Sequence, residues 1–212
     1  NAKHFMFTDE SFPPALFIKL PPMMVERDLG IYWTTLIRFE SQLLDPKLWD
    51  MAHRSGCRSL YYGLESANER IIKLVKKDTD IEAAKINLEQ AKRVGIWSHV
   101  MCFYGFPSET PEEAEDTRQF LIQNQGMIPS VEMYFFVLYK SAPVMFQTEE
   151  YKIRVKENPE HDLALDFYYT PDSGQTTEEA MARYEDFYRN DFDPWALRIN
   201  AREHVLLYIT HF

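Results

Sequence analysis

Polar residues and glycines that could bind a ligand or take part in catalysis lie at the ends of the apolar runs of this 212-residue sequence. Carboxylates can exchange protons with a substrate or bind an amine, arginine can bind a carboxylate, and glycine lets a ligand approach the backbone. A single acid in such a position could instead cap the next helix. Their recurrence after successive runs favours a binding site. The residues are Asp9, Glu10, Arg38, Gly63, Glu65, Ser66, Gly105 and Glu109.

Five apolar runs, which would position these residues, are predicted to be strands: residues 4–8, 31–38, 57–64, 96–104 and 131–138. Segments with helical periodicity separate the runs, and this alternation predicts parallel strands joined by right-handed crossovers. The carboxyl ends of parallel strands meet at one edge, where α/β proteins bind their ligands. We therefore expect an α/β fold with the polar residues gathered at that edge.

Three of the intervening helices carry clear end signals. Asp45 precedes a proline and can cap a helix that ends near residue 56. Thr110 and Glu113 have the spacing of a capping box before a second helix. Gly95 is placed to end a third. The first crossover differs because Pro21 and Pro22 lack the amide hydrogen that a continuous helix needs, so we expect two short helices there.

The alternation of strand and helix stops after residue 138. Two helical patterns follow, at about residues 177–189 and 193–210. We therefore expect a barrel-like or open sheet unit at residues 1–140 and a mainly helical C-terminal extension at residues 141–212.

Composition narrows the functional class. Thirty-three acidic against twenty-three basic residues give a formal charge of -10, which opposes nucleic-acid binding. No apolar run has the length of about 20 residues that a membrane span needs, so we expect a cytoplasmic protein that does not bind membranes. Its substrate would be a small molecule or is unknown. Cys57 and Cys102 lie inside apolar stretches and are predicted to be buried thiols, and His99 is predicted to be a packed or hydrogen-bonded core residue.

Several motifs in a fixed order resemble one family. They are FMFTDESF, IYWTTLIRFE, LLDPKLWDMAHRSGCRSLYYGLES, KKDTDIEAAKINLEQAKRVGI and MCFYGFPSETPEEAEDT, between residues 4 and 138. The sequence resembles the radical S-adenosylmethionine (radical SAM) superfamily, particularly the branch that often carries a cobalamin-binding domain. The resemblance implies an incomplete partial TIM barrel, with the second to sixth barrel strands present. It also implies S-adenosylmethionine, a 4Fe-4S cluster and an electron donor, which together generate a 5'-deoxyadenosyl radical.

The resemblance assigns parts of S-adenosylmethionine to the first three strand ends. Asp9 and Glu10 would meet the methionine amine, and Arg38 would pair with the methionine carboxylate. Glu65 and Ser66 would contact the ribose or the methionine part.

The last two strand ends would lie beside the adenine. The stretch that contains Gly105, Phe106 and Pro107 resembles the adenine-side motif, with Glu109 displaced from its commonest spacing and therefore suited to bracing the loop. Val137 and Leu138 would lie on the last parallel strand, with backbone groups near the adenine.

The family's CxxxCxxC cluster loop is absent from this sequence. Cys57 and Cys102 stand 45 positions apart, so we expect no metal site formed by this chain. The expectation is a C-terminal fragment that is inactive in radical chemistry alone, with cobalamin, if used, bound by a missing N-terminal domain.

Two other functions remain open from the residues. One is a cluster-free acid-base enzyme that uses the same carboxylates, and the other is a degenerate, non-catalytic binding module. Loss of a first strand would also expose the edge of the strand at residues 4–8, which predicts a dimer through that edge.

Overall fold

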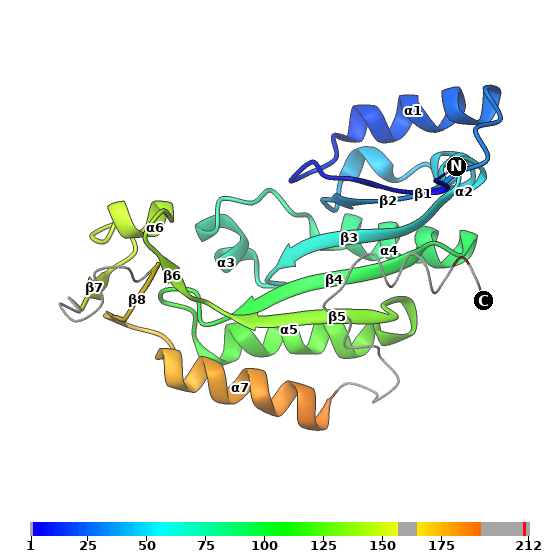
Figure 1. The fold of residues 1–212 in the computed structure, drawn as a ribbon. Helices are drawn as coiled ribbons and strands as arrows, with labels where there is room; N and C mark the ends of the chain where they lie inside the picture. The colour runs from blue at the N-terminus through cyan, green and yellow to red at the C-terminus, as the bar shows by residue number, and fades with distance from the viewer. Residues whose placement is uncertain (1, 157–164, 192–209, 211–212) are drawn as a thin grey trace.

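A computed structural model describes residues 2–156, 165–191 and 210 of the chain. Its centre is a five-stranded sheet in the order β1-β2-β3-β4-β5, with every neighbouring pair parallel. The strand arrows therefore run in one direction (Figure 1). The strands are β1 (His4–Phe7), β2 (Tyr32–Ile37), β3 (Cys57–Glu65), β4 (Trp97–Tyr104) and β5 (Ser130–Phe135).

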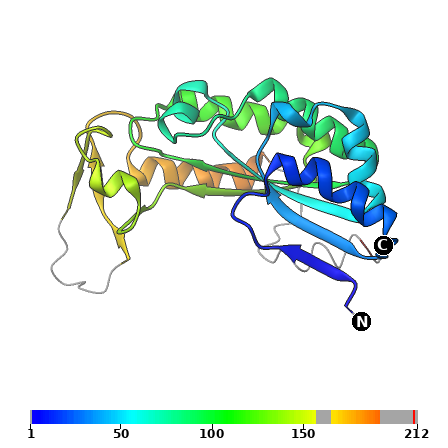
Figure 2. The same ribbon diagram turned by 90° about the horizontal axis from the view of Figure 1, so that it is seen from above.

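Helices connect each strand to the next. Because consecutive strands are neighbours and the crossovers share one hand, the connecting helices gather on one side of the sheet (Figure 2). They are α1 (Pro14–Glu26), α2 (Pro46–Arg54), α3 (Glu69–Leu74), α4 (Ile81–Val94) and α5 (Pro111–Gln123), with the 3-10 turns η1 (Ser41–Leu43) and η2 (Gln125–Met127).

The predicted strands and helix ends are largely confirmed. Asp45 accepts a hydrogen bond from the Lys47 amide at 2.9 Å, and Thr110 and Glu113 form the expected capping box at the start of α5. Gly95 ends α4 at φ 75°, a conformation that costs glycine little. The last parallel strand is the exception, because it ends at Phe135.

Helix α1 differs from the prediction of two short helices. It is continuous over residues that include Pro21 and Pro22, although each proline removes one backbone hydrogen bond. Phe17, Pro21 and Met24 are buried at helical spacing, and α1 packs against α2. Burial of this stripe offsets the lost hydrogen bonds, since tertiary packing commonly outweighs local propensity.

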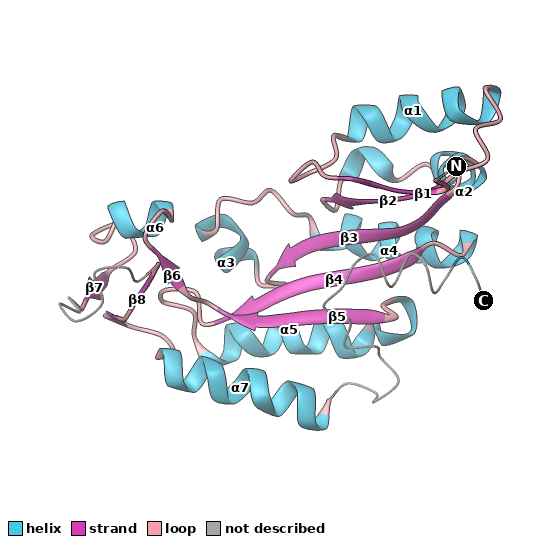
Figure 3. Cartoon of the chain, in the orientation of Figure 1, coloured by secondary structure: helices cyan, strands magenta, loops and turns pink. Residues whose placement is uncertain are grey.

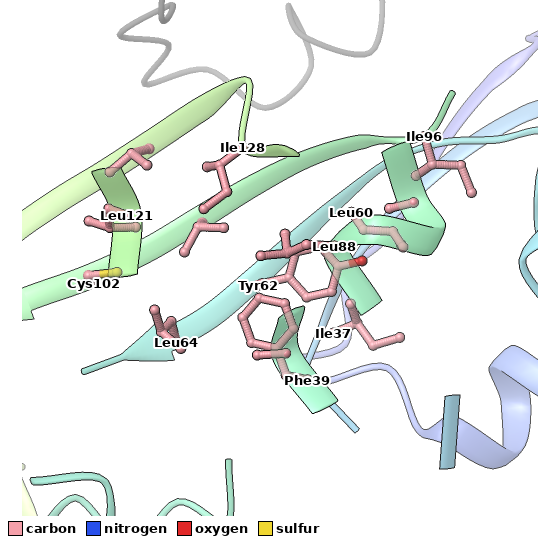
Figure 4. Packing of buried hydrophobic residues seen from close by; sticks show 14 of the residues in the cluster. Ile37, Phe39, Leu60, Tyr62, Leu64, Leu88, Ile96, Cys102, Leu121 and Ile128 are labelled. Atoms are coloured by element: carbon pink, nitrogen blue, oxygen red, sulfur yellow. The ribbon is translucent and has the colours of Figure 1, made fainter. Parts of the chain in front are cut away.

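The main hydrophobic core lies between the sheet and its helices. Leu60, Tyr62 and Leu64 alternate along β3 and all face the helices, as the two-residue period of a strand requires. The ring of Phe39 stacks on Tyr62 with centroids 4.3 Å apart, beside Leu88 of α4 (Figure 4). This core holds the sheet rigid beneath the polar residues at its edge.

The segment after β5 contains short strands that the sequence did not predict. Leu138–Tyr139 (β6) pairs antiparallel with Asp166–Phe167 (β8), and Ile153–Val155 (β7) pairs with Tyr169–Pro171 (β9). With α6 (Pro143–Phe146), β6, β7 and β8 lie beyond the arrowheads of the large sheet (Figure 3).

Helix α7 (Thr177–Asn190) confirms the helix predicted at 177–189. It packs against β4 and β5, and Ala180 and Phe187 join the main core. Nearly all of the helix predicted at 193–210 lies outside the described residues. Within the part of the chain that the structure describes, no helix is long and apolar enough to cross a membrane.

Candidate functional site at the carboxyl edge

The carboxyl ends of the five strands define one edge of the sheet, here called the carboxyl rim. Because all the strands are parallel, Asp9, Arg38, Glu65 and Gly105 lie at this same edge, Glu65 as the last residue of β3 and the others just after their strands. The predicted convergence of the strand ends is therefore confirmed as topology. The side chains that occupy the rim nevertheless have very different surroundings.

The loop after β1 presents its acids to solvent. Asp9 and Glu10 are exposed, while Phe12 is 1% exposed and packs on the ring of Phe7. The Phe12 amide donates to the Leu36 carbonyl at 2.8 Å, which ties the loop to β2. The backbone is thus anchored by an aromatic residue, and the carboxylates are left available to a ligand.

Arg38 follows β2 and is also exposed. Its guanidinium makes no hydrogen bond or ion pair with any residue in the described ranges, and neither does the carboxylate of Asp9 or Glu10. These three residues therefore combine opposite charges on one part of the rim without using them to hold the fold together.

Glu65 ends β3 in a backbone conformation that is unusual for a non-glycine residue. Its φ is 64°, next to a shift in the register between β3 and β4. Its carboxylate forms an ion pair with Lys77 at 3.0 Å and lies where a side chain at residue 63 would collide with it. Gly63 therefore makes room for Glu65, rather than for a ligand as we expected.

Ser66 is buried and has partners within the protein. Its hydroxyl lies 3.0 Å from Thr117 Oγ1 of α5 and accepts a hydrogen bond from the Asn68 amide. These contacts fasten the loop after β3 to α5. The side chain of Ser66 is thus engaged in the loop itself, and its cofactor contact stays a prediction.

The stretch GFPSET forms the loop between β4 and α5, here called the GFPSET loop (residues 105–110). Glu109 Oε2 accepts the amide hydrogen of Gly105 at 2.5 Å, and the Glu109 amide donates to the Phe106 carbonyl at 2.8 Å. The Glu109 carboxyl group therefore closes the loop on itself, which is the bracing role expected from its spacing.

The carboxyl group of Glu109 has an unusual electrostatic environment. It is 0% exposed, and burial raises its pKa to about 7, against the opposing effect of the Gly105 amide. Glu113 raises the pKa further, whereas Arg183 and Arg70 lower it. Its Oε1 atom has no hydrogen-bond partner among the described residues.

The remaining predicted residues are mostly apolar and buried. Phe106 packs edge-on against Tyr151 in a second hydrophobic cluster, and Pro107 lines a cavity beside that cluster. Val137 and Leu138 lie beyond β5, so their predicted place on the last parallel strand is wrong. Leu138 instead pairs with Phe167 of β8, because the chain turns there to form the extension.

Arg70 on α3 is a rim residue that the sequence did not single out. Its guanidinium donates to both carboxylate oxygens of Glu113, and to the Ser108 hydroxyl at 3.0 Å and the Ser108 carbonyl at 2.8 Å. It lines a cavity of about 380 Å³ between α3, the GFPSET loop and the extension. Only its place four residues after Ser66 could have suggested it.

A polar cluster that the sequence did not predict lies on the sheet face opposite the helices and consists of His99, Ser130 and Glu132. His99 is 1% exposed, which confirms the prediction that it is a core residue, and its Nδ1 lies 2.8 Å from Ser130 Oγ. Its Nε2 lies 3.5 Å from Glu132 Oε2 on the neighbouring strand. Strand alternation places these side chains together, and it becomes informative only when the pairing of β4 with β5 is known.

The thiols of this chain do not suit an iron-sulfur cluster. Cys57 and Cys102 are both fully buried on separate strands, and burial raises the pKa of each thiol, which opposes the thiolate form that iron requires. Within the described ranges, no group of three potential metal ligands comes together.

Comparison with known proteins agrees with this geometry. The model of the radical SAM superfamily matches residues 22–121, which span most of the helices and strands of the sheet. The chain therefore matches the radical SAM superfamily over these residues. The match covers the elements from β2 into α5, and the segment after β5 lies outside it.

Curated relatives include enzymes of two kinds. The chain is 25% identical over 178 residues to the anaerobic magnesium-protoporphyrin IX monomethyl ester cyclase of Rubrivivax gelatinosus, covering 82% of this chain and 31% of the cyclase. It is 30% identical over 158 residues to the bacteriochlorophyllide d C-12(1)-methyltransferase of Chlorobaculum tepidum, covering 72% of this chain and 32% of the methyltransferase. The chain spans about a third of the length of these relatives.

A solved structure confirms the radical SAM fold. The cobalamin-dependent S-adenosylmethionine radical enzyme OxsB matches with a TM-score of 0.65 and 12% identity, covering 88% of this chain and 34% of OxsB. At this identity the likeness concerns the fold, and it agrees with the predicted partial barrel of parallel strands and helices.

Proposed function

We propose that this chain binds S-adenosylmethionine along its carboxyl rim, as the second to sixth strands of a radical SAM barrel. The whole protein would then cleave S-adenosylmethionine reductively to give a 5'-deoxyadenosyl radical. The observation that carries this proposal is the convergence of successive parallel strand ends on one edge, with uncommitted charges at one part and a braced loop at another.

The charges of the rim complement the methionine part of the ligand. The carboxylates of Asp9 and Glu10 suit the ammonium group and the sulfonium charge, whereas the guanidinium of Arg38 suits the carboxylate. The GFPSET loop would border the adenine, with Glu109 holding its shape from beneath.

The cluster would supply the electron that breaks the bond between sulfur and the 5' carbon. The buried positions of Cys57 and Cys102 support the view that the cluster thiolates come from polypeptide outside this sequence. The names of the two relatives, a cyclase and a methyltransferase, support an enzymatic role for the whole protein.

The acid-base alternative has less support from the carboxylates. Glu109 has a pKa near neutrality, as a general acid needs, but its carboxyl group is 0% exposed and braces a loop. Glu65 is held by Lys77. Neither group therefore offers a substrate the accessible proton that hydrolysis requires.

Equilibrium dialysis with labelled S-adenosylmethionine tests the binding proposal. The wild-type chain should bind, and Arg38→Ala should weaken binding by about tenfold or more, as expected for a lost charge-assisted hydrogen bond. Arg54→Ala is the matched control, because Arg54 is also exposed but ends α2 at the opposite edge of the sheet. Binding that is absent, or equally weak in both variants, would refute the proposal.

Reconstitution with iron and sulfide tests the cluster assignment. Under reducing conditions this chain alone should form no 5'-deoxyadenosine, since its two thiols are buried apart. Formation of 5'-deoxyadenosine by this chain would show that its cysteines can hold a cluster.

A further inference from the structure

Ser108 in the GFPSET loop has a backbone conformation that a non-glycine residue does not favour. Gly105 has φ 81° and Ser108 has φ 70°, and a non-glycine residue in this region costs about 1 kcal/mol or more. Within the loop, the bonds from the Gly105 amide to Glu109 and from the Glu109 amide to Phe106 oppose this cost. The loop therefore depends on contacts from outside.

Besides the hydrogen bonds from Arg70 to Ser108, the loop is contacted by residues more than sixty positions later in the chain. The Tyr169 hydroxyl donates to the Gly105 carbonyl at 3.1 Å, at the start of the loop. The Gln175 amide donates to the Glu109 carbonyl at 2.8 Å, and Gln175 Nε2 lies 3.4 Å from Glu109 Oε2. The extension thus holds the loop at both ends.

Gln175 is itself fixed in place. Its side chain is 2% exposed, and Arg183 of α7 donates from Nε to Gln175 Oε1 at 3.1 Å. With its oxygen occupied by Arg183, the amide group directs its nitrogen toward Glu109. The orientation of Gln175 is therefore set by α7, and α7 is anchored in the main core through Phe187.

Close packing accompanies the hydrogen bonds. A side chain at Gly174 would lie 2.5 Å from the Glu109 carbonyl oxygen and 2.8 Å from the Ser108 Cα. A side chain at Gly105 would lie 2.4 Å from the Cβ of Ala180. Backbone of the extension and backbone of the loop are therefore in direct contact, so that neither can shift alone.

We propose that the extension after β5 clamps the GFPSET loop, with Tyr169 and Gln175 as positioning residues that set the loop conformation offered to S-adenosylmethionine. This inference rests on the proposed function, because it assigns the extension a part in cofactor binding. In chemical terms, the partner of the clamped loop is the adenosyl group, whose flat base requires a fixed backbone surface to lie against.

Gly174→Ala tests the clamp, and Gly95→Ala is its matched control. Both positions have positive φ, at 86° and 75°, so both substitutions bring a similar backbone penalty, but nothing lies within 4 Å of a side chain at Gly95. We expect hydrogen exchange of the Gly105 and Glu109 amides to rise about tenfold or more in Gly174→Ala only. The dissociation constant for S-adenosylmethionine should rise by a similar factor.

Tyr169→Phe tests the same idea with a smaller change. It removes one hydroxyl, and Tyr168→Phe removes an exposed hydroxyl from the neighbouring residue as the control. We expect the affinity for S-adenosylmethionine to fall about fivefold in Tyr169→Phe alone, the loss of about one hydrogen bond. Because the fold is retained in this variant, its result stands even if Gly174→Ala fails to fold.

The outcomes separate the clamp from the proposed function. If the wild type binds and Tyr169→Phe binds equally well with unchanged exchange at Gly105, the clamp is wrong and the proposed function stands. If exchange rises but affinity does not, the contacts are structural only and the inference is also wrong. If the wild type fails to bind S-adenosylmethionine, the proposed function is wrong, and the clamp, which rests on it, is wrong as well.

Discussion

The two parts of the carboxyl rim differ in how their polar groups are used. At the first part, Asp9, Glu10 and Arg38 are exposed and have no hydrogen-bond or ion-pair partner among the described residues. At the second part, Ser66 and Glu109 are buried and hydrogen-bonded within the protein. The comparison shows that similar residues at equivalent strand ends can be exposed to solvent in one place and hold the fold together in another.

This difference has a thermodynamic consequence. Groups that hold the fold contribute to the free energy of unfolding, and their loss is costly when buried partners are left unsatisfied. Exposed groups without partners contribute little to it, so substitutions there are free to change ligand affinity alone. Stability measurements can therefore separate the two parts of the rim.

Glu109→Gln should have the largest effect, seen in the pH dependence of stability. Because the pKa of Glu109 rises from 4.5 to about 7 on folding, the folded state binds a proton more tightly than the unfolded chain. This stabilisation is complete below about pH 4.5 and is lost as pH rises through 7. Between these values, wild type should lose up to about 3 kcal/mol relative to Glu109→Gln, measured by urea unfolding.

The control for Glu109 is Glu89→Gln, at an exposed position on α4. It should follow the pH profile of the wild type. Parallel profiles for wild type and Glu109→Gln would mean that the carboxyl group is not buried as described.

Ser66→Ala should have the next largest effect. It removes one of the two partners of Thr117 Oγ1, which also accepts from the Ala67 amide, and the partner of the Asn68 amide, at a cost of about 1–3 kcal/mol in the free energy of unfolding. Ser41→Ala, at an exposed position of η1, should change the free energy little. A neutral result for Ser66→Ala would mean that these hydrogen bonds do not stabilise the loop after β3.

Arg70→Ala should lower the free energy of unfolding by a smaller amount, about 1 kcal/mol at low salt. Its side chain is 46% exposed, so the ion pair with Glu113 is partly screened by solvent. The cost should shrink at high salt, and Lys73→Ala is the control because Lys73 pairs with Glu69 at 4.0 Å with both side chains exposed. A cost that does not change with salt would point to packing of the Arg70 stem.

Arg38→Ala should have the smallest effect on folding. We expect a change within about 0.5 kcal/mol in the free energy of unfolding, because Arg38 is exposed and has no described partner. A loss of more than about 1 kcal/mol would show that the first part of the rim also supports the fold, and would remove the distinction drawn here.

Local signals in the sequence predicted the sheet and most of its helices. Asp45, Thr110 and Glu113 satisfy amides within three residues of themselves, so their roles follow from spacing alone. Pro21 and Pro22 gave a wrong prediction because burial of one face of α1 outweighs their local effect. Gly63 and Gly105 were predicted to let a ligand approach the backbone, but the groups that lie close to them in the structure are Glu65 and Ala180 of the same chain.

The sequence by itself determined the alternation of strands and helices, and hence that polar residues after the strands would meet at one edge. Only the tertiary structure decided which of those residues are free to meet a ligand. Ser66 meets Thr117 and Glu109 meets Gln175 across 51 and 66 positions of sequence. Such partners are brought together by packing, because hydrogen bonds and burial depend on distance in space. That distance cannot be predicted from the residues near each partner in the sequence.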